Sequence, residues 1–141
     1  MKLFEEMKFN IGELTGIGSD SVSEHLKLYA GYVKHANLIL SKIEEMNKDP
    51  ETNAYALGEL QRRFGFEFDG MRNHEYYFKS LEGQATPLSP ESTLTQAIAQ
   101  EWGSFDAWLV RFKAIALTRG IGWAILYYDK TTGRLLNAWI D

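Results

Sequence analysis

Residues 70–81, Gly-Met-Arg-Asn-His-Glu-Tyr-Tyr-Phe-Lys-Ser-Leu, place a histidine among large apolar side chains. On a helix, His74 shares a face with Met71, Phe78 and Leu81, because positions three and four apart lie above one another. A histidine in apolar surroundings must satisfy both ring nitrogens. Either one nitrogen binds a metal while the other meets an acceptor or water, or the ring is a core histidine bonded to backbone. Spacing alone favours the core histidine.

The sequence before this stretch predicts a long helix. Residues 1–18 mix glycines with apolar residues and indicate an extended lead-in. Ser19 and Asp20 offer N-caps for a helix that runs to about Met46. Along it, apolar side chains recur every three or four positions, as one helical stripe requires. These positions are Val22, Leu26, Tyr29, Val33, Ala36, Ile39 and Ile43.

A second long helix is predicted over residues 52–81. The polar break at 47–50 contains a proline, which cannot sit inside the preceding helix. Gly65 and Gly70 are weak points or bends in the second helix. Two long helices joined by a short loop pack as an antiparallel hairpin.

The first helix carries a histidine and two tyrosines on one face. His25, Tyr29 and Tyr32 follow the spacing i, i+4, i+7. In an antiparallel hairpin, this face and His74 could converge on one site. The alternative is a tyrosine-rich helix interface, to which the phenols add buried area. We expect His35 to be exposed.

The second half of the chain begins after a stretch with two prolines, residues 82–90, which is the best domain boundary. We therefore predict a helical hairpin domain over 1–84 and an incomplete α/β domain over 85–141. In the second domain, one helix is predicted from Ser92 to Gly103. Ser104 caps another that runs to about residue 118.

The helical period then changes to that of strands. Residues 122–128 are rich in strand formers, residues 129–133 supply a turn with glycine at its end, and 134–141 form a second strand. The predicted fold class is α+β: an antiparallel helical hairpin followed by a helical and antiparallel-sheet lobe that lacks its last strand and helices.

Composition excludes several classes of protein. The 141 residues contain 15 Lys and Arg against 19 Asp and Glu, which argues against nucleic acid as a partner. There is no cysteine, so disulfides, thiolate zinc sites and cysteine nucleophiles are excluded. No apolar run approaches the length of a membrane span, and residues 1–8 do not form a secretory signal. We expect a soluble, cytoplasmic protein without a membrane partner.

Four blocks of sequence carry a resemblance to a known family. Asn73-His-Glu-Tyr-Tyr-Phe-Lys-Ser-Leu81 resembles the second-helix signature of the iron/manganese superoxide dismutases, and His25 to Asn37 resembles their first-helix signature. Gly103-Ser-Phe-Asp-Ala-Trp108 and Arg119-Gly-Ile-Gly-Trp-Ala-Ile-Leu-Tyr-Tyr-Asp129 resemble two later blocks. The blocks occur in the family's order over nearly the whole chain.

This resemblance implies a function and a set of site residues. His25 and His74 would be metal ligands, and Tyr32 the tyrosine that lines the substrate funnel and takes part in catalysis. Phe78 and Trp123 would be aromatic walls around the metal. The implied cofactor is Fe or Mn, the substrate is superoxide, and the implied assembly is a homodimer. The reaction would be the one-electron disproportionation of superoxide to oxygen and peroxide.

Two departures from the family pattern bear on activity. Most members place the ligand histidine eight residues before the tyrosine, whereas His25 lies seven before Tyr32, so an ungapped match puts Glu24 there. We favour His25, because a local gap is a commoner change than a changed ligand. No Asp-x-x-x-His, the family's source of the remaining ligands, occurs in the sequence.

These departures leave two functional readings open. We expect a superoxide dismutase whose metal binding and activity are impaired in this short chain. The alternative is a non-catalytic superoxide-dismutase-like domain that acts as a binding or oligomerisation module through its unfinished sheet edge.

Overall fold

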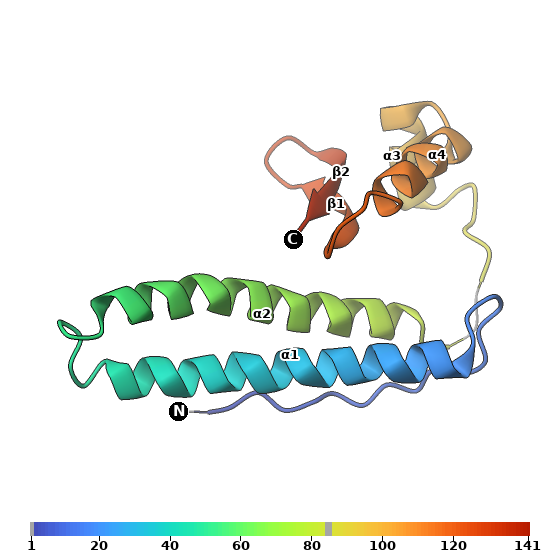
Figure 1. The fold of residues 1–141 in the computed structure, drawn as a ribbon. Coiled ribbons are helices and arrows are strands. Elements are labelled where there is room, and N and C mark those ends of the chain that lie inside the picture. The colour runs from blue at the N-terminus through green and yellow to red at the C-terminus, as the bar shows by residue number, and fades with distance from the viewer. Residues whose placement is uncertain (1, 84–85) are drawn as a thin grey trace. The chain divides into compact units, whose positions relative to one another are not determined.

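The computed structural model describes residues 2–83 and 86–141 (Figure 1). Four helices precede a two-stranded antiparallel sheet within these residues. This confirms the predicted α+β class. The chain forms two compact units, Met1–Gln84 and Ala85–Asp141. That each unit folds as an independent domain stays a prediction.

The first unit is a hairpin of two long helices that lie side by side (Figure 1). Helix α1 spans Ser19–Met46 and helix α2 spans Ala54–Ser80. The predicted apolar stripe of α1 supplies the buried residues Tyr29, Val33, Ala36 and Ile39. Helix α2 is continuous through both glycines that the sequence marked as weak points, because packing along the hairpin outweighs their low helix propensity.

The start of α1 differs from the prediction. Its N-cap is Gly18, whose extended backbone lets the chain enter the helix, and no side chain caps the first turn. Ser19 and Asp20, predicted as N-caps, lie inside the first turn instead. There the negative charge of Asp20 still favours the helix through the positive end of its dipole.

The N-terminal segment runs along the hairpin as a strap that side chains hold in place. The Asn37 amide accepts from the Phe4 N–H at 2.8 Å and donates to the Phe4 carbonyl at 2.9 Å. The Met7 N–H donates to Tyr29 Oη at 2.8 Å. Phe4 and Phe9 of the strap pack against the buried core of the hairpin.

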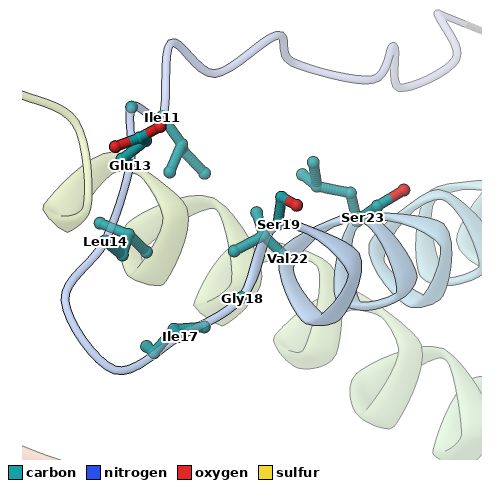
Figure 2. A pocket seen from close by; sticks show the side chains of 10 residues that line it. Ile11, Glu13, Leu14, Ile17, Gly18, Ser19, Val22 and Ser23 are labelled. Carbon is teal, nitrogen blue, oxygen red and sulfur yellow. The ribbon is translucent and has the colours of Figure 1, made fainter.

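A pocket of about 630 Å³ lies between the end of this strap and the first turns of α1 (Figure 2). Its lining mixes apolar side chains, among them Ile11, Leu14, Ile17 and Val22, with the polar Glu13, Ser19 and Ser23. Its lining residues, which fall within described residues 11–26, include none of the predicted site residues.

The second unit begins with two short helices whose caps agree with the sequence. Helix α3 spans Thr93–Trp102 and helix α4 spans Phe105–Ala116. The hydroxyls of Ser92 and Ser104 accept hydrogen bonds from backbone N–H groups three residues on, which satisfies helix donors that would otherwise lack partners.

A hairpin completes the second unit. Strands β1, Trp123–Asp129, and β2, Arg134–Ile140, pair antiparallel from Trp123 opposite Ile140 to Asp129 opposite Arg134. Gly133 closes the turn with φ +70°, a conformation that glycine adopts without strain. Over residues 2–83 and 86–141, no helix is long and apolar enough to cross a membrane.

Candidate functional site

The hairpin brings two histidines together from different helices. The ring centroids of His25 on α1 and His74 on α2 lie 4.8 Å apart, with the rings nearly perpendicular. His74 is only 5% exposed, so its ring lies in the packed interior of the hairpin. Antiparallel packing is the cause: the two positions lie at matching heights on facing helix surfaces.

A backbone hydrogen bond defines the tautomer of His74. Its Nδ1 lies 2.6 Å from the Gly70 carbonyl oxygen, one helical turn earlier. A carbonyl only accepts, so Nδ1 carries the proton and Nε2 is the nitrogen with the lone pair. Metal-binding histidines commonly have this arrangement, in which the second nitrogen donates to a fixed acceptor.

Burial favours the neutral form of both histidines. Desolvation lowers the pKa of His74, the Gly70 carbonyl raises it in part, and the nearby His25 lowers it further. Desolvation also lowers the pKa of His25. Both imidazoles are therefore uncharged near neutral pH, the form in which imidazole binds a metal.

The residue beside His25 points elsewhere. Glu24, which an ungapped match places at the ligand position, is exposed, and its carboxylate lies 2.6 Å from the Lys27 ammonium. His35 is 55% exposed, as predicted, and its Nδ1 lies 3.8 Å from a Glu67 carboxylate oxygen. Of these three α1 side chains, His25 packs against the His74 ring.

Two aromatic residues from the prediction complete a cluster with the histidines. The Tyr32 ring centroid lies 5.0 Å from that of His74. Phe78 is 1% exposed, and its centroid lies 5.0 Å from that of His25 and 6.0 Å from that of His74. We call His25, Tyr32, His74 and Phe78 the histidine cluster. Trp123 belongs to the second unit, on β1, so its role as an aromatic wall stays a prediction.

Known proteins with similar sequences point to one family. Residues 90–141 match the family model described as iron/manganese superoxide dismutases, C-terminal domain. The chain is 34% identical over 135 residues to "Superoxide dismutase [Mn]" of Mycolicibacterium smegmatis. The aligned region covers 94% of this chain and 64% of that protein. The chain is similar to the iron/manganese superoxide dismutase family over most of its length.

Relatives named for either metal share this similarity. "Superoxide dismutase [Fe]" of Mycobacterium tuberculosis is 34% identical over 134 residues, 93% of this chain and 63% of the relative. "Superoxide dismutase [Fe]" of Cupriavidus metallidurans is 33% identical over 130 residues, 90% of this chain and 64% of the relative. The chain thus spans 63–64% of the length of these three superoxide dismutases.

The sequence analysis missed a buried polar network beside the cluster. Tyr29 Oη donates to Glu75 Oε1 at 3.1 Å, and Arg72 donates to Glu75 Oε2 at 2.5 Å. Burial raises the pKa of Tyr29, the Met7 N–H opposes this, and the Glu75 charge raises the pKa further. The i, i+3 spacing of Arg72 and Glu75 was the only signal in the sequence, and it is typical of exposed helix pairs.

The described residues supply only part of a metal site. Within residues 2–83 and 86–141, no three histidine, aspartate, glutamate or cysteine side chains group as metal ligands. The two imidazoles of His25 and His74 fit iron or manganese as nitrogen donors. They do not make a complete donor set within the part of the chain that the structure describes.

Proposed function

We propose that this chain takes part in the disproportionation of superoxide at an iron or manganese centre. His25 and His74 would supply two of the metal's ligands, and Tyr32 would lie beside them. The observation that carries the proposal is a pair of imidazoles from facing helices, with ring centroids 4.8 Å apart, in a chain similar to enzymes named superoxide dismutase.

The donor set leads us to propose that the chain alone is a poor enzyme. Two imidazoles hold a metal weakly, and ligand number and geometry decide which metal binds. Bound iron or manganese supplies a one-electron change, as the reaction requires. The fraction of chains that carry metal limits turnover, so two donors predict low activity.

The protein's own groups would orient the reactants and handle protons. Formation of peroxide from two superoxide anions, with release of one oxygen, consumes two protons. The Tyr32 phenol can both donate and accept a hydrogen bond, so it is suited to hold a proton beside His74. Phe78, almost wholly buried against both histidines, would exclude water from one side of the imidazole pair.

Metal binding by histidine variants tests this proposal. The chain would be loaded with Fe²⁺ or Mn²⁺, and metal content and superoxide consumption measured for His25→Ala, His74→Ala and the control His35→Ala. We expect weak metal binding and low consumption that are lost in the first two variants and retained in His35→Ala. Metal binding that all three variants retain equally would overturn the ligand assignment.

The alternative proposal is a non-catalytic binding or oligomerisation module. Two observations favour it: the incomplete donor set, and a sheet whose two strands leave both outer edges unpaired in the part of the chain described. A homodimer would be one form of this module. Sedimentation and metal analysis separate the proposals, because a module would self-associate without metal and without superoxide consumption. A cytoplasmic location stays a prediction.

A further inference from the structure

The Tyr32 ring occupies the space that a Cβ atom at Gly70 would fill. Gly70 is buried in α2, eight positions before Phe78 and one turn before His74. A Cβ built at this position would lie 2.4 Å from Tyr32 Cε1 and 2.5 Å from Tyr32 Cδ1. Carbon atoms in van der Waals contact lie about 3.5–4.0 Å apart. A side chain at position 70 would therefore force the Tyr32 ring out of the position it has in this structure.

The other glycines of α2 show that this contact is specific. Around Gly58 and Gly65, a Cβ would meet nothing within 4 Å. All three glycines lie in the same helix, and none of them has the positive φ that would itself require glycine. Glycine in a helix interior lowers the folding equilibrium constant by about two- to fivefold relative to alanine. Only at Gly70 does the closeness of another side chain account for this cost.

Gly70 also contacts His74 through its carbonyl. That oxygen accepts the Nδ1 proton of His74 at 2.6 Å, which orients the imidazole and defines its tautomer. The Tyr32 ring, packed over the Gly70 Cα, lies 5.0 Å from the same imidazole. One residue thus touches both a candidate ligand and the candidate catalytic phenol.

We propose that Gly70 is a positioning residue that sets the Tyr32 ring against the His74 imidazole. Its carbonyl holds the imidazole, and its lack of a side chain admits the phenol ring alongside. The consequence for catalysis rests on the proposed function, whereas the arrangement of the two rings does not. The proposal is therefore tested on the metal-free chain.

The test compares Gly70→Ala with the matched control Gly65→Ala. Both variants add one methyl group to the same helix. We would record the ring resonances of Tyr32 and His74 by NMR on chain labelled in tyrosine and histidine. We expect Gly70→Ala to shift both sets of resonances in a folded chain, and Gly65→Ala to leave them in place. Unchanged Tyr32 and His74 resonances in folded Gly70→Ala would overturn the proposal.

A measurement of stability, made in the natural chain and in Tyr32→Ala, covers the case in which Gly70→Ala does not fold. In Tyr32→Ala the ring is gone, so a methyl group at position 70 has room. We expect Gly70→Ala to lower the folding equilibrium constant at least tenfold in the natural chain, and not to lower it in Tyr32→Ala. An equal loss in both backgrounds would show that Tyr32 is not the constraint and would overturn the proposal.

Failure of the proposed function has a different signature. If the chain binds neither iron nor manganese, the superoxide assay fails while the ring resonances and the two-background comparison still give their results. If Gly70 has no positioning role, those two measurements fail whatever the metal content.

Discussion

The Tyr29 hydroxyl on α1 donates a hydrogen bond to the buried Glu75 carboxylate on α2, at 3.1 Å, and accepts one from the Met7 N–H. A single phenol oxygen thereby joins both helices and the N-terminal strap. Tyr29 is 2% exposed and Glu75 is 7% exposed, so water cannot easily replace either partner. This makes the hydroxyl a point at which a small change should have a measurable effect.

Removing that hydroxyl should destabilise the hairpin. Tyr29→Phe keeps the ring but leaves the Met7 N–H and one Glu75 oxygen without their partner. A buried polar group left unsatisfied costs about 1–3 kcal/mol, so we expect the free energy of unfolding to fall by about that amount. Urea unfolding followed by circular dichroism measures it, because the first unit contains no tryptophan.

Tyr76→Phe is the matched control. Tyr76 lies on the same helix as Glu75 but is 71% exposed, so its hydroxyl is solvated in both the folded and the unfolded chain. We expect no measurable change in stability. Equal effects of the two substitutions would contradict the role given to the buried hydroxyl.

The strap should be released locally by a change at Asn37. Its amide makes two hydrogen bonds to the backbone of Phe4, and Asn37→Ala removes both. Each such bond contributes about 1 kcal/mol, so strap opening should become roughly ten- to thirtyfold more frequent. Hydrogen exchange at the amide of Met7, whose bond to Tyr29 Oη the substitution leaves in place, would measure this, with the amides in the middle of α2 as the internal control. Faster exchange throughout α2 would indicate global destabilisation and contradict local release.

Helix positions were predictable because local patterns determine them. The stripe of α1 predicted Tyr29 and Val33 as buried, and they are. Ser92 and Ser104 cap their helices through hydrogen bonds to backbone N–H groups three residues later. Such bonds are local, so the sequence alone is enough to predict them. The N-cap of α1 was the exception, since Gly18 begins the helix without any side-chain bond, and so leaves no side-chain signal.

The buried network could not be predicted because it depends on distant partners. Glu75 is charged and follows His74 directly, features typical of a solvated helix position. It is buried because Tyr29, 46 residues earlier, and Arg72 satisfy its carboxylate oxygens. The packing of Tyr32 on Gly70 is of the same kind. The helix propensity of glycine marked Gly70 as a weak point, whereas the contact arises from the pairing of α1 with α2.

The contribution of the Ser104 N-cap of α4 to the stability of the second unit should be measurable. All four tryptophans lie there, so tryptophan fluorescence follows its unfolding selectively. Ser104→Ala removes the hydroxyl that accepts from the Ala107 N–H, which should cost about 0.5–2 kcal/mol, whereas Ser104→Gly should cost only a few tenths. A larger loss for glycine than for alanine would contradict a capping role.

Stability of the second unit should depend on pH through Glu101. The Arg134 guanidinium on β2 donates to this α3 carboxylate and holds the pKa of Glu101 below its ordinary 4.5. Because the folded chain binds this proton less readily than the unfolded chain, the stabilisation is present above about pH 4.5 and is lost as pH falls through the folded pKa. The measurement is the difference in free energy of unfolding between the natural chain and Glu101→Gln, followed by tryptophan fluorescence from pH 7 to pH 3.

Arg134, the partner of Glu101, supplies the control for this pH dependence. We expect Glu101→Gln to be less stable than the natural chain near neutral pH, and the difference to shrink as pH falls below 4.5. In an Arg134→Gln background the carboxylate has lost the guanidinium that lowers its pKa, so Glu101→Gln should produce a smaller difference with a weaker pH dependence. A difference that persists unchanged to pH 3, or that is the same with and without Arg134, would show that the ion pair does not link α3 to β2 energetically.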